Sequence, residues 1–232
     1  MIYITGDTHR DFGRIFDFCN RIGTTKDDTI IILGDAGINF LGDSKDKELK
    51  ERLSELPITL FCIHGNHEMR PRSVGTYRLG EAFKGTVYVE PKYPNIQFAV
   101  DGELYEINGY KTVVCGGAYS VDKPFRLANG YGWWPDEQPD DVTKRRVVEL
   151  LKKMDWKADC VLTHTAPLKY EPVENFIPGL DQSSVDKSTE FWLDGIEDKL
   201  DYKRWYAGHY HCDKWKSDKF RLMFNDIDEF MG

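Results

Sequence analysis

The strongest constraint on the fold is the way histidine, aspartate and asparagine side chains follow short apolar runs. Runs such as residues 29–33 and 160–163 are rich in Ile, Val and Leu and have the length of buried strands. A polar motif comes directly after several of them. Because the carboxyl ends of parallel strands meet at one edge of a sheet, we expect the fold to bring these distant motifs together.

The remaining pattern predicts an alternation of strands and helices. The apolar runs that read as strands are residues 1–5, 29–33, 58–63, 112–115, 160–163 and 204–207. Apolar residues at helical spacing predict helices at 12–22, at 43–56, from Pro139 to Met154, and at 188–200. Strand, helix and strand in succession indicate parallel βαβ units in the first third of the chain.

The middle of the chain has a different pattern. Residues 96–100, 103–107 and 110–115 are separated by Asp101-Gly102 and Asn108-Gly109, two dipeptides typical of type I′ hairpin turns. We therefore predict a three-stranded antiparallel meander, and either one mixed sheet or two packed sheets. The segments 121–138 and 170–187 show no regular period, and loops of that length are more often functional than idle.

Length, charge and cysteine content limit the class of protein. The 232 residues fit a single domain over 1–232, and the net charge of −8 argues against nucleic acid or an anionic membrane as the main partner. Five scattered cysteines without a CxxC motif indicate reduced thiols and a cytoplasmic location. The first strand begins right after Met1, which leaves no room for a signal peptide, and no apolar run is long enough to span a bilayer.

The polar motifs carry the donors of a metal site. Asp7 and His9 are two residues apart after the first strand, as are His209 and His211 after the last, and this spacing places both side chains on one face. Each motif alone is common in proteins without a metal. Together they offer enough nitrogen and oxygen donors for two divalent ions with an open position for water, from Asp7, His9, Asp35, Asn66, His164, His209 and His211.

These motifs also carry a family resemblance. The order Gly6-Asp7-x-His9, Gly34-Asp35, Gly65-Asn66-His67-Glu68, His164 and Gly208-His209-x-His211 resembles the calcineurin-like metallophosphoesterase superfamily over nearly the whole chain. The resemblance implies an α/β fold, a four-layer αββα sandwich of two mixed β-sheets flanked by helices. Ala36-Gly37 after Asp35 departs from the protein serine/threonine phosphatases, which disfavours that branch.

The resemblance further implies roles for individual residues. Asp7, His9, Asp35 and His211 would hold one ion, and Asp35, Asn66, His164 and His209 the other. His67 would donate a proton to the leaving group, and a hydroxide bridging the ions would attack phosphorus. Manganese is the expected metal, although iron, zinc and nickel also suit such a mixed set of donors.

The sequence offers several candidate substrate contacts and more than one function. Arg10, Arg14, Lys123 and Arg126 could each meet a phosphate, although solvated surface charge is the default for such residues. The predicted substrate is a phosphomonoester or small phosphodiester. The alternatives are a nuclease, which the acidic balance disfavours, and a catalytically silent protein-binding module, which the complete donor set disfavours. The sequence gives no oligomeric state.

Overall fold

The computed structural model describes residues 1–42, 44–176 and 182–232, and within them the strands form two sheets. The first sheet has the order β13-β1-β2-β3-β6-β5-β4 and the second the order β11-β12-β10-β9-β8-β7. The strands of the first sheet are β1 (Ile2–Thr5), β2 (Thr29–Ile32), β3 (Thr59–Cys62), β4 (Arg78–Ala82), β5 (Gly85–Glu90), β6 (Tyr93–Ala99) and β13 (Ile227–Glu229). Those of the second are β7 (Leu104–Ile107), β8 (Tyr110–Cys115), β9 (Cys160–Thr163), β10 (Arg204–Ala207), β11 (Lys214–Trp215) and β12 (Phe220–Leu222).

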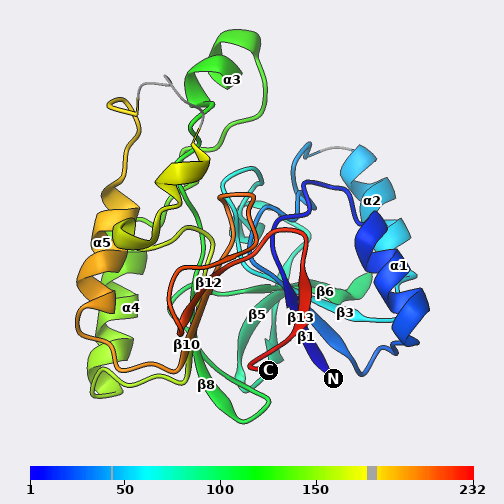
Figure 1. Ribbon diagram of the computed structural model, residues 1–232. Coiled ribbons are helices and arrows are strands. Elements are labelled where there is room, and N and C mark those ends of the chain that lie inside the picture. Colours follow the sequence, from blue (N-terminus) through cyan, green and yellow to red (C-terminus); the bar gives the residue numbers. More distant parts are fainter. Residues whose placement is uncertain (43, 177–181) are drawn as a thin grey trace.

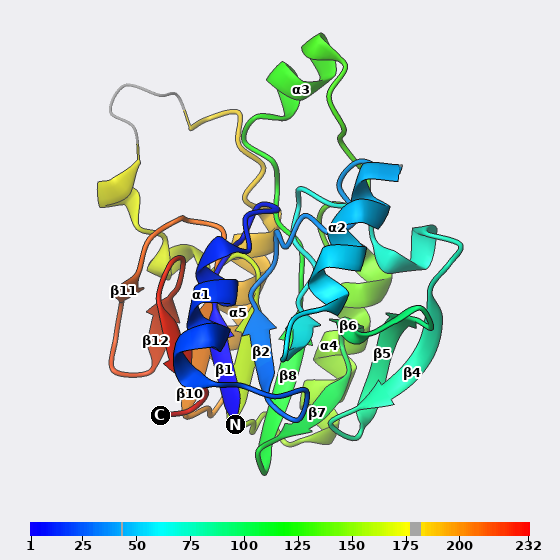
Figure 2. The ribbon, with the colours of Figure 1, turned by 90° about the vertical axis from the view of Figure 1, so that its right-hand side faces the viewer.

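Helices cover both outer faces of the paired sheets (Figure 1). Helices α1 (Gly13–Ile22) and α2 (Ser44–Ser54) lie against the first sheet, and α4 (Asp141–Lys153) and α5 (Ser188–Glu197) lie against the second. Helix α3 (Lys123–Asn129) buries none of its side chains and projects from the body of the protein (Figures 1 and 2). Short 3₁₀ turns lie at Pro71–Ser73, Leu168–Tyr170 and Val173–Asn175. The predicted four-layer α/β sandwich is thus confirmed. No helix in the described parts of the chain is long and apolar enough to cross a membrane.

Strand β2 shows why the sandwich is stable. Ile30 and Ile32 pack with helix residues in the outer core, whereas Ile31 and Leu33 pack in the core between the two sheets. Because side chains alternate along a strand, a continuous apolar run serves a strand that is buried on both faces. Strands β1, β2 and β3 pair in parallel, which confirms the predicted βαβ units.

The predicted three-stranded meander is wrong in one part. Strands β7 and β8 form the expected antiparallel hairpin, and both Asn108 (φ 52) and Gly109 (φ 82) have the positive φ that a type I′ turn needs. Strand β6, however, belongs to the first sheet, so the Asp101-Gly102 turn joins two different sheets. Its geometry follows from buried polar contacts, because the Asp101 carboxylate accepts from Arg70 at 2.5 Å and from the Gly116 N–H at 2.7 Å.

The predicted helices are present with shifted ends. Helix α4 begins after Asp140, not at Pro139, and α5 ends at Glu197, not at residue 200. Strands β4 and β5 were not predicted, and their alternation is weak, with Gly80 and Glu81 in an exposed edge strand. Segment 121–138 contains α3. Asp43, the predicted start of the second helix, and positions 177–181 of the segment 170–187 lie outside the described residues.

We expect Asp140→Ala to lower the free energy of unfolding by about 1 kcal/mol at neutral pH. Asp140 caps α4, since its side chain accepts the Thr143 N–H at 2.7 Å. This hydrogen bond holds the pKa of Asp140 below its usual value, so the stabilisation is complete above the unfolded pKa of about 3.9 and is lost as the pH falls through the folded pKa. Urea denaturation at pH 7 and at lower pH measures both effects. Asp140→Asn, which retains an acceptor, is the control, and equal loss in both variants would contradict the capping role.

Candidate metal centre

The first group of donors lies where β1 and β10 end. Asp7 is fully buried, and its Oδ1 accepts the backbone N–H of His209 at 2.9 Å. Its Oδ2 has no hydrogen-bond partner, and it lies 3.6 Å from His9 Nε2 and 3.4 Å from His211 Nε2. The nearest ring nitrogens of His9 and His211 are only 2.8 Å apart. A buried, unpartnered carboxylate oxygen that faces two imidazole nitrogens fits the requirements of a cation.

The second group of donors lies beside the first. Asp35 is buried, its Oδ1 accepts the His67 N–H at 2.8 Å, and the same oxygen lies 3.6 Å from His164 Nε2. Asn66 Oδ1 lies 2.8 Å from His164 Nε2. His164 Nδ1 lies 2.8 Å from the carbonyl oxygen of Leu33 and, as a donor to it, leaves the lone pair on Nε2. That nitrogen then faces the amide oxygen of Asn66, and a single cation could bind both atoms.

The two groups share residues and form one site. Donor atoms of Asp7, His9 and His211 lie within 4.8 Å of one another, and so do those of Asp7, Asp35 and His164. Asp35 Oδ2 lies 3.9 Å from His9 Nδ1, which connects the two groups. The ring of His209 is 5.0 Å from that of His164. The structure therefore brings all seven predicted donors to one edge of the sandwich.

The protonation states of Asp7 and His209 suit metal binding. Burial would raise the pKa of Asp7, but the neighbouring imidazole rings of His211 and His9 hold it well below its usual range, so Asp7 is ionised. Burial lowers the pKa of His209 to about 3, so its ring is neutral. Ionised carboxylate and neutral imidazole are the forms in which these side chains bind metals.

Local backbone strain accompanies the site. Four of the donor residues adopt the left-handed conformation that favours glycine, with φ of 45° at His9, 46° at Asp35, 67° at His209 and 48° at His211. Such conformations cost free energy and persist only where the surrounding structure imposes them. Here the turns after the strands point the side chains back toward a common centre.

The glycines of the motifs permit close approach of the loops. A Cβ atom at Gly208 would lie 2.4 Å from Asp7 Oδ1 and 2.7 Å from the Leu33 carbonyl oxygen. We expect Gly208→Ala to displace the Asp7 carboxylate and to weaken divalent-metal affinity by at least about tenfold, the effect typical of disturbing a ligand's support. Titration of the metal-free protein with Mn²⁺ measures this. Gly75→Ala, where a Cβ would contact nothing, is the control, and unchanged affinity for Gly208→Ala would rule out the close contact.

A cavity of about 310 Å³ opens beside the donors. His67 and the donors Asp35, Asn66, His209 and His211 form one part of its lining. The other part comes from the loop before α3, from the segment after β9, from α5 and from the loop after β10. Its residues are Tyr119, Val121, Glu171, Asn175, Phe176, Gln182, Val185, Lys187, Glu190 and Tyr210. The predicted functional segments 121–138 and 170–187 thus both reach the cavity.

The basic residues considered as phosphate contacts already have partners. Arg10 forms an ion pair with Asp46 at 2.5 Å and donates to the Gly37 carbonyl, and Arg126 pairs with Asp122 at 2.8 Å. Lys123 Nζ lies 4.1 Å from the centre of the Trp133 ring. Their contacts with a substrate stay predictions. Arg14 donates to the backbone carbonyls of Gly6, Asp7 and Phe224, which fixes the first loop.

Several residues around the donors were not assigned a role from the sequence. Ser120 accepts from the Asn66 amide at 3.0 Å and orients it. Glu68 is fully buried and accepts the Ile38 N–H, and burial raises its pKa to about 8. Glu68 stands inside the recognised Gly65–Glu68 motif, which was a usable signal. Ser120 and Glu190 stand in no motif and could not be found by pattern.

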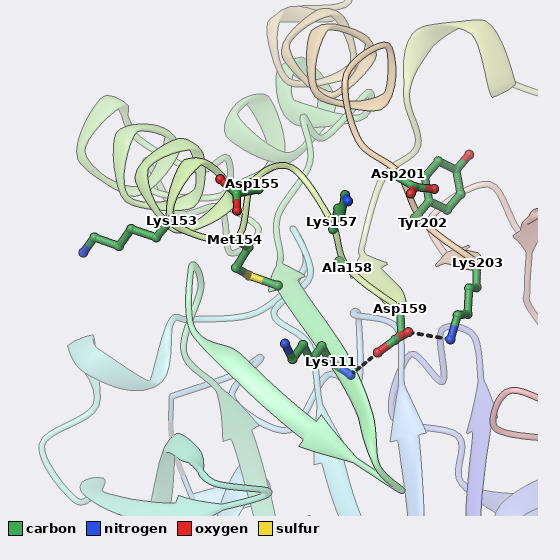
Figure 3. Close-up of a pocket in the computed structure, with 10 residues that line it drawn as sticks. All are labelled: Lys111, Lys153, Met154, Asp155, Lys157, Ala158, Asp159, Asp201, Tyr202 and Lys203. Atoms are coloured by element: carbon green, nitrogen blue, oxygen red, sulfur yellow. Dashed lines mark hydrogen bonds and ion pairs between the residues drawn. The ribbon is translucent and has the colours of Figure 1, made fainter.

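Another cavity, of about 490 Å³, lies at the opposite end of the second sheet (Figure 3). It adjoins the amino ends of β9 and β10, where Asp159 accepts from Lys203 at 2.7 Å and from the Lys111 N–H at 2.9 Å. Lysine side chains on the surface surround it, and it does not share residues with the donor site. We therefore take the cavity beside the donors as the candidate functional site.

Comparisons with known proteins bear on the family and the fold of the chain. The sequence model of the calcineurin-like phosphoesterase family matches residues 1–213. The fold is similar to that of TT1561 of Thermus thermophilus, with a TM-score of 0.51 and 14% identity over 96% of this chain and 87% of that one. A phosphopantetheinyl hydrolase (PptH) from Mycobacterium tuberculosis matches with a TM-score of 0.40 and 14% identity over the same shares of the two chains. Comparison with curated protein sequences gives no significant match.

Proposed function

The chain belongs to the calcineurin-like phosphoesterase family, and from this premise we propose that it is a metal-dependent hydrolase of a phosphomonoester or a small phosphodiester. The observation that best supports the proposal is the convergence of buried carboxylates with imidazole donors on shared centres. Divalent ions held there would neutralise phosphoryl oxygens and lower the pKa of a water that attacks phosphorus.

We propose two ions, with manganese as the first choice. Asp7, His9 and His211 would hold one ion, Asn66, His164 and His209 the other, and Asp35 would contact both. The fit rests on the unpartnered Asp7 Oδ2 and on two pairs of potential ligand atoms that lie 2.8 Å apart, His9 with His211 and His164 with Asn66. Mixed nitrogen and oxygen donors also accept iron, zinc and nickel.

Other features of the site would position the ions and the substrate. Asp35 would fix the spacing of the two donor groups, and the His67 ring, whose Nε2 lies 3.9 Å from Asp35 Oδ2, would lie beside the leaving group. A cavity of about 310 Å³ is near the lower limit for small-molecule sites, which favours a small phosphorylated substrate. The net charge of −8 weighs against a nuclease, and the free thiols are consistent with a cytoplasmic enzyme.

A substrate panel with metal analysis on the same sample tests the proposal. Metal-stripped protein is reloaded with Mn²⁺ and assayed with 4-nitrophenyl phosphate, bis(4-nitrophenyl) phosphate and single-stranded DNA. Hydrolysis of a nitrophenyl ester that depends on added metal is the expected result. Cleavage of the DNA alone would replace the proposal by the nuclease. Failure to bind any divalent ion would replace it by a protein-binding module.

A further inference from the structure

The wall of the cavity away from the metal donors is unexpectedly acidic for a site that receives phosphate. Glu190, in the first turn of α5, is 4% exposed, and Glu171, after the 3₁₀ turn Leu168–Tyr170, is 8% exposed. Both line the cavity together with Tyr210, which stands between the donors His209 and His211. These two carboxyl groups are not part of the donor set described above.

One carboxylate oxygen of Glu190 lacks a hydrogen-bond partner in the described structure. Its Oε1 accepts the hydroxyl of Thr165 at 2.7 Å, and Thr165 is also 3.1 Å from the Tyr210 hydroxyl. Its Oε2 is buried and has no hydrogen-bond partner in the described structure. A buried acceptor without a partner is costly, and in a native cavity it calls for a ligand or water that supplies the missing donor.

The neighbouring Glu171 limits the kind of ligand group that can donate a hydrogen bond to Glu190 Oε2. Its Oε2 accepts from Lys187 Nζ at 2.7 Å, and its Oε1 lies 3.5 Å from the Tyr210 hydroxyl. Two carboxyl groups would repel a phosphoryl group, so the phosphate must lie at the metal donors and the leaving group at this wall. Lys187 pairs with Glu171 and offsets its charge, so what remains unsatisfied is the Glu190 Oε2 atom, which lacks a hydrogen-bond donor. A neutral hydroxyl group supplies that donor without bringing a further charge into the buried wall.

Aromatic rings complete the wall. Phe176 and Tyr210 lie with their ring centres 6.3 Å apart and an angle of 18° between planes, and Tyr119 also lines the cavity. Flat apolar faces beside hydrogen-bond acceptors suit a ring that carries hydroxyl groups on its edge and C–H groups on its face.

We propose that Glu190, together with Glu171 and Tyr210, forms a subsite for a hydroxyl-bearing leaving group, so that the preferred substrates are phosphate esters of a sugar or of a nucleoside ribose. This rests on the proposed phosphoesterase function. Glu190 would accept a hydroxyl hydrogen bond through Oε2, and the phosphate would lie at the metal donors.

A matched pair of esters tests the subsite. Ribose 5-phosphate and tetrahydrofurfuryl phosphate differ in the ring hydroxyls alone. We expect the wild-type protein, loaded with Mn²⁺, to prefer ribose 5-phosphate by about 10- to 100-fold in kcat/KM, mainly through KM, because the analogue leaves the buried Glu190 oxygen without a hydrogen-bond donor. Glu190→Ala should bring the ratio close to one, and Glu190→Gln, which keeps an acceptor, should restore part of it. Glu149→Gln, on the exposed face of α4, is the matched control.

Calorimetric titration of the same two esters keeps the two proposals separable, because binding does not require turnover. If the wild type binds ribose 5-phosphate preferentially and Glu190→Ala removes that preference, the subsite is supported even when no ester is hydrolysed. Absence of hydrolysis would then refute the phosphoesterase function and leave the subsite in place. Equal binding of the two esters by the wild type, or a ratio that Glu190→Ala leaves unchanged, would overturn the subsite. Adenosine 5′-monophosphate in the same titration distinguishes the sources, since tighter binding than ribose 5-phosphate assigns the subsite to a nucleoside and weaker binding to a free sugar.

Discussion

Replacing Asp35 by Asn is expected to lower kcat by about 10³-fold or more, a loss of at least about 4 kcal/mol of transition-state stabilisation. Asp35 is 1% exposed and lies between the two groups of donors, 3.6 Å from His164 Nε2 and 3.9 Å from His9 Nδ1. An amide in its place keeps the shape and an oxygen that can accept the His67 N–H, but it removes the negative charge that would offset two neighbouring cations. The metal content should therefore fall together with the rate.

Metal analysis and the kinetics of 4-nitrophenyl phosphate hydrolysis, run on one preparation, check this expectation. Asp17→Asn, on the exposed face of α1, is the matched control and should leave both quantities unchanged. If Asp35→Asn kept its full metal content and lost less than about tenfold in rate, Asp35 would not be the residue shared by the two ions.

The convergence of the seven candidate donors was predictable because each follows a buried strand, and the strand pattern is strong. Residues 29–33, for example, are apolar on both faces, so the position of Asp35 after them follows from the chain alone. Because β1, β2 and β3 are adjacent and parallel, their carboxyl ends then bring Asp7, Asp35 and Asn66 to one edge of the sheet. At these positions the strands expected from the local sequence pattern are the strands that the fold contains.

The sheet partner of a strand was less predictable than the strand itself. Asp101-Gly102 has the composition of a hairpin turn, yet it carries the chain from one sheet to the other. The deciding contacts of Asp101 are with Arg70 and Gly116, which are distant in sequence, and no local pattern contains them.

The acidic wall of the cavity was unpredictable for the same reason, because it depends on packing between segments that are distant in sequence. Glu190 reads as an ordinary acidic residue in the first turn of a helix, and only the packing of α5 makes it a buried acceptor.

Replacing His67 by Ala is expected to preserve the bound metal and to lower kcat by about 10²- to 10⁴-fold, the usual range for loss of an acid–base group. His67 is not in either group of converging donors, although its backbone N–H donates to Asp35 and its ring lines the cavity. Its Nδ1 is buried and has no partner in the described structure, so the ring has unused capacity to bond a ligand.

The leaving group should decide how large the loss is. Burial lowers the pKa of His67, so the ring is neutral in the metal-free protein near pH 7, and transfer of a full proton requires the anionic substrate to raise that pKa on binding. Either that transfer or a hydrogen bond from the neutral ring helps most when the departing oxygen is strongly basic. His67→Ala should therefore slow an alkyl phosphate far more than 4-nitrophenyl phosphate, whose leaving group needs no proton. His67→Gln, which can donate a hydrogen bond but cannot transfer a proton, separates these two contributions. Equal losses for both esters, or a parallel loss of metal, would instead make His67 a residue that supports the donors.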